Sequence, residues 1–258
     1  MPETLPMEEP TIAPRQRPSV SIVIPTLNEA ANVEPLVRQV AENAPADAEI
    51  IIVDDGSDDG TVDRVRSLAE EHAVRLMQRD NPTLGLSGAV IAGARAARGE
   101  VLIVMDADLS HPPADIPSLL TPLLDGRADM VIGSRYVRGG TTPGWPLFRR
   151  ILSRAAAGVA YPLTGVHDSM CGFFAIRRVR LLELTPRATG FKIAFEAIVN
   201  GGRTFRVLEV PIAFRDRVRG TSKMNTRVAL LFSTRWLLAA TRILMRRHRR
   251  PSASDSHR

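Results

Sequence analysis

The chain has 258 residues, of which 44% are hydrophobic and 5% aromatic, enough for one large domain with an aliphatic core. Its single cysteine, Cys171, excludes an intramolecular disulfide. The formal net charge is +6, and arginines dominate from Arg203 onward, which indicates a polyanionic partner such as a membrane surface or a phosphorylated substrate. The sequence carries neither zinc-finger spacing nor an aromatic RNA-binding motif, so no nucleic-acid partner is expected.

The first hundred residues alternate between apolar runs and amphipathic segments. The apolar runs predict strands at 20–25, 49–53, 74–77 and 101–105. Segments with apolar side chains at helical spacing predict helices at 28–43, 61–72 and 88–98. Strands that alternate with helices in this way predict a parallel, doubly wound α/β sheet.

The second half continues with mixed elements. Helices are predicted at 116–124, 147–163 and near 191–200, and strands at 130–133, 171–176 and 205–210. Together with the first half, these elements are expected to form one domain.

The two ends of the chain differ from this domain in composition. Residues 1–18 contain Pro and Glu without the apolar stretch of a signal peptide, and are expected to be a disordered arm before a domain spanning 19–225. Residues 226–258 hold an apolar segment, 228–245, and a basic run, 246–250. A central arginine costs a spanning helix about 2.5–3.5 kcal/mol, so an amphipathic helix lying on a membrane is expected. A helix packed on the domain, with a solvated basic tail, is the alternative.

Polar side chains follow three of the predicted strands at the point where each strand ends. They occupy residues 25–29, 54–57 and 106–108. Because open α/β sheets bind ligands beyond the carboxyl ends of their strands, these segments are expected to meet at one edge of the sheet.

The third of these segments, Asp106-Ala107-Asp108, places two carboxylates one residue apart after a buried strand. Two like charges this close repel unless a cation lies between them. Mg²⁺ takes one or two carboxylates and fills its shell with substrate phosphates, so it is a natural candidate. For the triplet alone, a loop with solvated aspartates stays open.

These motifs resemble those of inverting family 2 glycosyltransferases with the GT-A fold, a Rossmann-like, mostly parallel sheet flanked by helices. The matching segments are IPTLNE (24–29), VDDGSDDGT (53–61) and MDAD (105–108). Further segments are similar to polyprenyl (dolichyl) phosphate mannose synthases: LGLSGA (84–89), DLSHPP (108–113), GSRY (133–136), RRILSR (149–154) and FRDRVRGTSK (214–223).

The resemblance implies a role for each matching position. A sugar nucleotide, with GDP-mannose favoured, would contact Pro25, Leu27, Glu29, Asp54, Asp55, Asp106, Ala107 and Asp108. Mg²⁺ or Mn²⁺ would be held by Asp106 and Asp108, with Ser110 as a third candidate ligand. The phosphate of a polyprenyl phosphate would be bound by Arg135, Arg149, Ser153, Arg217 and Lys223. Catalysis would depend on Asp106, Asp108, Arg135 and Arg217.

A phosphate acceptor is also favoured on chemical grounds. Transfer to a sugar hydroxyl needs a carboxylate base near the nucleophile, whereas a phosphate monoester is already anionic, with a second pKa near 6. A phosphate needs positioning and charge compensation instead, which arginine supplies. The best candidate base of the second half is Glu196, for which a structural role in a helix is preferred.

Several alternatives stay open. Within the class, they are a UDP-glucose-dependent transfer to the same lipid, and a family 2 enzyme that acts on a sugar or protein acceptor. A nucleotidyltransferase would carry a Gly-rich basic loop after the first strand, where this chain has residues 25–29. An inactive partner subunit would not need the intact set of acidic residues.

The expected location is cytoplasmic, as a peripheral protein on the cytoplasmic face of a membrane. A membrane-embedded partner subunit is left open.

Overall fold

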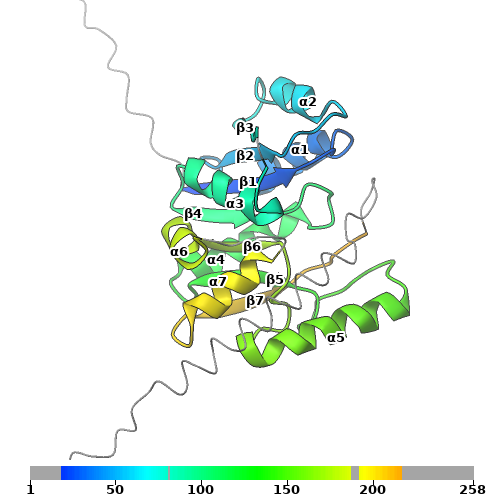
Figure 1. The fold of residues 1–258 in the computed structure, drawn as a ribbon, viewed down its shortest axis with the longest axis vertical. Helices are drawn as coiled ribbons and strands as arrows, with labels where there is room; N and C mark the ends of the chain where they lie inside the picture. The colour runs from blue at the N-terminus through cyan, green and yellow to red at the C-terminus, as the bar shows by residue number, and fades with distance from the viewer. Residues whose placement is uncertain (1–18, 81, 187–191, 217–258) are drawn as a thin grey trace, which may run out of the picture.

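The computed structural model describes residues 19–80, 82–186 and 192–216. Within them, seven strands form one sheet in the order β3-β2-β1-β4-β6-β5-β7 (Figure 1). The strands are β1 (Val20–Thr26), β2 (Glu49–Asp54), β3 (Val74–Gln78), β4 (Val101–Val104), β5 (Met130–Ser134), β6 (Phe174–Arg177) and β7 (Val207–Pro211).

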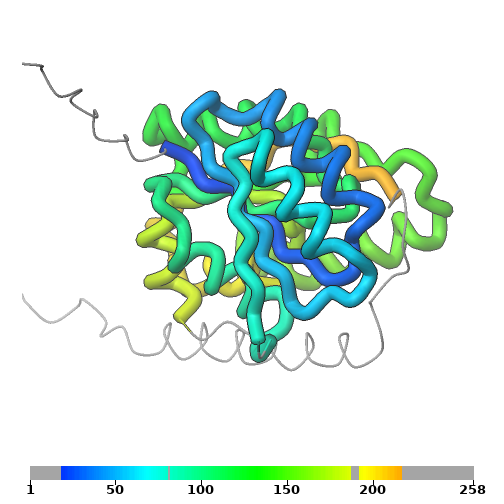
Figure 2. Tube along the Cα trace, turned by 90° about the horizontal axis from the view of Figure 1, so that it is seen from above, coloured from blue at the N-terminus to red at the C-terminus, as the bar shows by residue number. Residues whose placement is uncertain are grey.

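Helices cover both faces of this sheet. They are α1 (Val33–Asn43), α2 (Thr61–Leu68), α3 (Gly85–Ala96), α4 (Ile116–Leu124), α5 (Leu147–Thr164), α6 (Arg178–Leu184) and α7 (Ile193–Gly201), with a 3₁₀ turn at Pro113–Asp115. Helix α3 packs on β1 and β2 and contacts α6, which in turn contacts α7, whereas α1 contacts α2 and the 3₁₀ turn before α4. Helix α5 lies at the rim of the molecule (Figure 1). In Figure 2, α5 and the segment just before it, both green, project from the rest of the domain.

Every strand and helix predicted for the described residues is present, and the mostly parallel α/β architecture is confirmed. The helix predicted at 28–43 begins later, at Val33, because Asn28 has a left-handed backbone (φ 57°) and the chain turns there. The strand predicted at 171–176 begins only at Phe174. Helix α6 has no predicted counterpart, since its seven residues follow β6 without a break.

Strand β6 is the exception to the parallel arrangement. It pairs antiparallel with both β4 and β5, whereas every other neighbouring pair of strands in the described sheet is parallel. Because β6 runs backwards, the loop before it lies where β4 and β5 end: Phe174 pairs with Val104 on one side and Ile132 on the other. This reversal brings residues 168–173 to the edge of the sheet where the polar segments were expected.

The core is aliphatic and the central strands are buried along their whole lengths. Strands β1, β2, β4 and β5 contain no exposed residue, which explains why they are continuous apolar runs. Helix α3 approaches β1 closely at Gly93, where an added Cβ would lie 2.4 Å from Cγ1 of Val23. The strand ends are therefore fixed by a closely packed scaffold.

Parts of the expected organisation lie outside the described residues: the arm 1–18, the segment 226–258, and the two predicted site residues Arg217 and Lys223. Among the helices that the structure describes, none combines the length and hydrophobicity needed to cross a membrane.

Candidate active site

The carboxyl ends of β2, β1 and β4 lie side by side, since these strands are neighbours and parallel. In the register of the sheet, Thr26 at the end of β1 is opposite Asp54 at the end of β2. The three polar segments predicted to share one edge therefore do so.

At the end of β2, the two aspartates have different surroundings. Asp54 is fully buried, and its carboxylate accepts hydrogen bonds from the N–H groups of Gly56 (3.0 Å) and Ser57 (2.9 Å) and from the Ser57 hydroxyl. Asp55 forms an ion pair with Arg79 at 3.0 Å; burial raises the pKa of the Asp55 carboxyl, although the guanidinium opposes that shift. Asp54 thus shapes the loop in which Asp55 is presented.

The loop after β1 is tied to the loop after β2. The Asn28 N–H donates to Ser57 Oγ (2.8 Å), and Asn28 Oδ1 accepts from the Asp58 N–H (3.0 Å). The Glu29 N–H donates to Thr61 Oγ1 at 2.9 Å. Just before Asn28 in the sequence, Leu27 is 37% exposed, and Pro25 lines a small pocket that Asp106 also lines. Two of the predicted donor-binding segments are therefore held in one fixed arrangement.

The segment after β4 holds the paired carboxylates in a tight turn. Asp108 is buried, and its Oδ1 accepts from both the N–H (3.1 Å) and the hydroxyl (2.5 Å) of Ser110. The intervening Leu109 has a left-handed backbone, with φ of 60°. The Asp106 side chain is 36% exposed, so it is the carboxylate of the pair that faces outward.

The donor set of this turn fits a divalent cation. Two carboxylates supply the hard oxygen ligands that Mg²⁺ and Mn²⁺ prefer, and the Ser110 hydroxyl orients one of them. No group of three or more His, Cys, Asp and Glu side chains suited to a metal occurs in the part of the chain that the structure describes. Mg²⁺ held by one or two carboxylates fills the rest of its shell with substrate phosphates and water.

The buried side chain of His111 contacts the backbone of Asp106. His111 Nδ1 accepts the Asp106 N–H at 3.1 Å, so the ring's proton is on Nε2, which faces Cys171 Sγ at 3.7 Å. Burial lowers the pKa of His111, in keeping with this neutral tautomer, and raises the pKa of the Cys171 thiol to about 12. Next to Cys171 in the sequence, Gly172 lets the backbone approach the Asp106 side chain closely. A Cβ at Gly172 would lie 3.1 and 3.2 Å from the Asp106 carboxylate oxygens.

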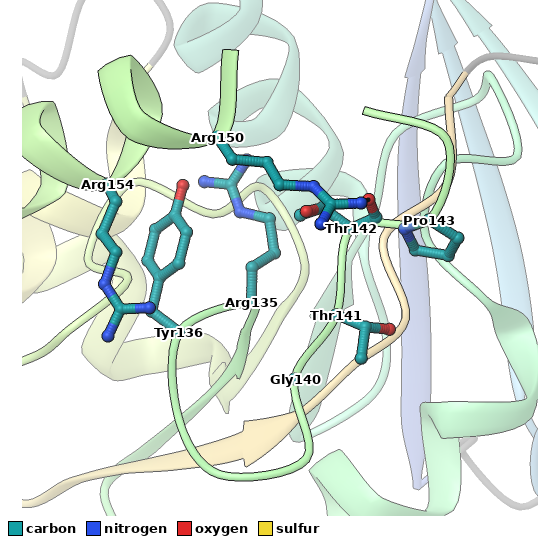
Figure 3. Close-up of a pocket in the computed structure, with 8 residues that line it drawn as sticks. All are labelled: Arg135, Tyr136, Gly140, Thr141, Thr142, Pro143, Arg150 and Arg154. Carbon is teal, nitrogen blue, oxygen red and sulfur yellow. Dashed lines mark hydrogen bonds between the residues drawn. The ribbon is translucent and has the colours of Figure 1, made fainter. Parts of the chain in front are cut away.

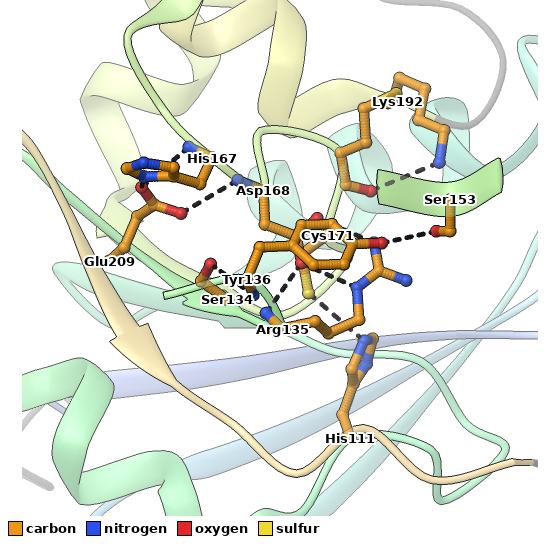
Figure 4. A network of polar contacts seen from close by, with 11 residues as sticks. His111, Ser134, Arg135, Tyr136, Ser153, His167, Asp168, Cys171, Lys192 and Glu209 are labelled. Carbon is orange, nitrogen blue, oxygen red and sulfur yellow. Dashed lines mark hydrogen bonds and ion pairs between the residues drawn. The ribbon is translucent and has the colours of Figure 1, made fainter. Parts of the chain in front are cut away.

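The second half of the site is built around Arg135, directly after β5 (Figure 4). Its Nε and Nη2 donate to the two oxygens of fully buried Asp168 at 2.7 and 2.8 Å, so the pKa of Arg135 is held above its usual value despite burial. Glu209 on β7 fixes Asp168 in turn, by accepting its N–H at 3.0 Å. The pair leaves Nη1 as the guanidinium nitrogen that Asp168 does not bond.

Arg135 also lines a cavity of about 370 Å³ between the end of β5, the loop 140–143 and α5. Figure 3 shows Arg150 and Arg154 extending from α5 beside Arg135 and Tyr136. The Tyr136 hydroxyl lies 2.6 Å from Ser153 Oγ. The cavity therefore gathers three guanidinium groups, and its neighbourhood includes the predicted residue Ser153.

Arg149, also predicted to bind the acceptor phosphate, is not among the residues that line this cavity. Its Nη1 pairs with Asp216, and its guanidinium stacks on Trp145, with Cζ 3.9 Å from the ring centroid. Arg150 and Arg154 belong to the RRILSR motif but were not among the predicted ligands. The signal was their spacing of four residues, which places two side chains on one helix face. Glu196 lies on α7 and is partly buried.

Comparison with known proteins gives a consistent result. A family model described as glycosyl transferase family 2 matches residues 21–198. A dolichol-phosphate mannosyltransferase of Pyrococcus furiosus is 41% identical over 214 residues, 80% of this chain and 59% of that protein. A polyprenol monophosphomannose synthase of Mycolicibacterium smegmatis is 40% identical over 248 residues, 89% of this chain and 90% of that protein. The chain thus spans less than two thirds of the archaeal relative, but nearly all of the mycobacterial one.

Solved structures support the fold. The glucosyl-3-phosphoglycerate synthase of Mycobacterium tuberculosis, in complex with Mn²⁺, UDP-glucose and phosphoglyceric acid, superimposes with a TM-score of 0.61 at 22% identity, over 80% of this chain and 72% of that one. The same enzyme with Mg²⁺ and UDP gives a TM-score of 0.61 at 23% identity, over the same shares of the two chains.

Proposed function

This chain belongs to glycosyl transferase family 2, and we propose that it transfers mannose from GDP-mannose to the phosphate of a polyprenyl phosphate, with inversion. The observation that carries this proposal is the joining, at one edge of the sheet, of a carboxylate turn and an arginine-lined cavity of about 370 Å³. The first suits a metal-bound diphosphate, and the second suits the phosphate of an acceptor. The relatives named above supply the mannose and the lipid class.

On the donor side, Asp106 and Asp108 are the residues that would hold Mg²⁺ or Mn²⁺. When bound, such a cation supplies Lewis-acid stabilisation of the charge that develops on a leaving diphosphate. The chain's own contribution is orientation: Ser110 fixes the Asp108 carboxylate, and His111 fixes the backbone of Asp106. Pro25, Leu27, Glu29 and Asp55 border the nucleotide in this proposal, with Asp54 shaping the loop that carries Asp55.

On the acceptor side, one phosphate oxygen attacks the anomeric carbon as the bond from that carbon to the β-phosphate oxygen of GDP-mannose breaks, which releases GDP. The attacking oxygen is already anionic, so no side chain needs to remove a proton from it. Arg135, aligned by Asp168, is proposed to bind this phosphate together with Arg149, Ser153 and the two arginines of the cavity. Arg217 and Lys223 complete the proposed set on the strength of the family motif.

We also propose that the protein is peripheral, on the cytoplasmic face of a membrane. Helix α5 supports this, because it exposes a run of large apolar side chains next to the arginines of the cavity. They are Leu147 (71% exposed), Phe148 (76%), Ile151 (60%) and Leu152 (59%). Apolar side chains that insert at the headgroup level, flanked by cations, are typical of interfacial helices. A lipid phosphate could reach the cavity from such a surface without leaving the bilayer.

The transfer is tested by incubating the purified protein with Mg²⁺ or Mn²⁺, a polyprenyl phosphate, and labelled GDP-mannose or UDP-glucose. We expect labelled lipid from GDP-mannose, none after chelation of the cation, and a loss of about a thousandfold or more in Asp108→Ala. Asp125→Ala, an exposed residue after α4, is the matched control and should keep full activity. Labelled lipid from UDP-glucose alone, or transfer only to sugar acceptors, would overturn the proposal.

Membrane contact is tested by flotation with anionic vesicles. The double substitution Phe148→Ser and Ile151→Ser should weaken binding to the vesicles. Val179→Ser on α6, at a residue that is 57% exposed, should leave vesicle binding unchanged. Equal binding of both variants would show that α5 is not in contact with the bilayer.

A further inference from the structure

Lys192 is a partly buried cation that the mechanism above does not use. Lys192 and Lys223 are the sole lysines of the sequence, in which every other basic side chain of the 34 is arginine. Lys192 directly precedes α7, with a non-helical backbone, and is partly buried. It lines the same small pocket as Asp106, Gly172 and Pro25. Its position is therefore beside the proposed metal turn.

The ammonium group of Lys192 has little compensation from the protein. Nζ donates to the carbonyl oxygen of Met170 at 3.4 Å, and it forms no ion pair with a carboxylate of the described residues (Figure 4). Burial lowers the pKa of Lys192, and Arg135 lowers it further, while Asp106 and Asp168 oppose the shift. A cation that is removed from water without a direct ion pair is costly for a folded protein, so an anion from outside the chain would stabilise it.

A second feature of the same pocket also favours an anion. Ile193 and Ala194, the first two residues of the nine-residue helix α7, line it. The N-terminal N–H groups of a helix lack intrahelical partners, and the helix dipole places positive potential there. Lys192 and the first residues of α7 thus border one small volume, in which both the ammonium and the helix dipole favour an anion.

We propose that the Lys192 ammonium binds a substrate phosphate oxygen in the centre of the site, between the carboxylate turn and Arg135. This inference rests on the proposed function, which offers two sources of that oxygen: the diphosphate of the sugar nucleotide and the phosphate of the lipid. In either case the lysine supplies a positive charge to the reacting groups from a position beside the proposed metal turn.

Substitutions of Lys192 distinguish a role in ligand binding from a role in folding. Lys192→Met should lower kcat/KM by about a hundredfold or more, as loss of one preorganised donor to a charged group does, while Lys192→Arg keeps part of the activity. The ligand-free Met variant should unfold at the same or a higher temperature than the parent, because an uncompensated charge has been removed. A lysine with a merely structural role would give the opposite result, a lower unfolding temperature with unchanged binding.

Calorimetry with GDP and Mn²⁺ distinguishes the two sources. If the oxygen belongs to the diphosphate, Lys192→Met weakens GDP binding and raises the KM for GDP-mannose. If it belongs to the lipid phosphate, GDP binding is unchanged and the KM for polyprenyl phosphate rises. Unaltered constants for both substrates would overturn the inference.

Amine labelling tests the contact without any transfer reaction. With Lys192 and Lys223 as the sole side-chain amines, acetylation followed by peptide mass spectrometry reports each position separately. GDP or inorganic pyrophosphate with Mn²⁺, or polyprenyl phosphate, should protect Lys192. Protection by pyrophosphate would support the inference even if GDP-mannose proved not to be the donor. Equal labelling with and without all three ligands would overturn it.

Discussion

Gly172 leaves room for the carboxylate of Asp106. Since a Cβ at this position would lie 3.1 and 3.2 Å from its oxygens, Gly172→Ala should displace the carboxylate by a few tenths of an ångström. Because a misplacement of about 1 Å at a reacting centre can cost about a hundredfold in rate, this smaller one should lower activity by about tenfold or less. We expect Gly172→Ala to need more Mn²⁺ for half-maximal transfer, while its free energy of unfolding changes by less than about 1 kcal/mol.

Gly158→Ala on α5 is the control for this prediction, because a Cβ there meets no atom within 4 Å. An unchanged Mn²⁺ requirement in Gly172→Ala would mean that the position of Asp106 does not depend on this contact.

Asp129, just before β5, gives stability that depends on pH. Hydrogen bonds from the Arg206 side chain and N–H hold the pKa of Asp129 below its ordinary value of 3.8. This contribution is present above the ordinary pKa and is lost as pH falls through the lowered one. Because the side chain is 34% exposed, Asp129→Asn should cost about 1 kcal/mol or less at neutral pH.

Urea unfolding of the parent and of Asp129→Asn, from neutral pH down to about pH 3, measures this effect. The difference between the two proteins should shrink toward the acid end. A difference that is constant across this range would exclude ionisation of Asp129 as its cause.

At the scale of elements, two helical glycines should respond oppositely to the same substitution. Gly93 on α3 faces Val23 and Val53 at distances that a Cβ would reduce to 2.4 and 3.0 Å, so Gly93→Ala should destabilise the protein by about 1–3 kcal/mol. Gly158 on α5 has open space, and Gly158→Ala should stabilise the helix by about 0.5–1 kcal/mol. Thermal unfolding of both variants checks the pair, and equal signs would contradict the packing of α3.

The elements that the sequence predicts well are those with a strong pattern. Buried strands appear as apolar runs, and the polar residues after β1, β2 and β4 mark their ends. The direction of β6 could not be predicted, because an apolar strand has the same pattern whether it runs parallel or antiparallel. Helix α6 was not predicted from the sequence, because its seven residues are too few to show helical periodicity after a strand.

The position of Asp106 and Asp108 at the edge of the sheet could be predicted, because they directly follow a buried apolar run that forms β4. The different surroundings of Asp54 and Asp55 could not, since adjacent aspartates in a turn are indistinguishable until the fold shows which one is buried. Lys192 carries no spacing signal at all. Its importance depends on the pocket in which the fold places it.

At the scale of the whole molecule, the basic second half of the chain should make the use of the lipid sensitive to salt. Exposed cations near a membrane are screened over about 10 Å at 0.1 M salt, whereas buried pairs such as Arg135–Asp168 are screened much less. Raising salt should therefore increase the KM for polyprenyl phosphate in anionic vesicles more than the KM for GDP-mannose. In neutral vesicles the increase should be small. An equal increase for both substrates would argue against an electrostatic membrane contact.

The reversed strand β6 has a consequence for how the molecule can open. Within the described sheet, β3, β2, β1 and β4 lie on one side of β6, and the last three of these carry the polar segments. They meet β5, which precedes Arg135, and β7, which carries Glu209, only through β6, which is bonded on both sides. Its amide hydrogens should therefore exchange with solvent only when the whole domain unfolds, more slowly than those of the edge strand β7. The separation between the carboxylates and the arginines is then set by a strand that local fluctuations do not release.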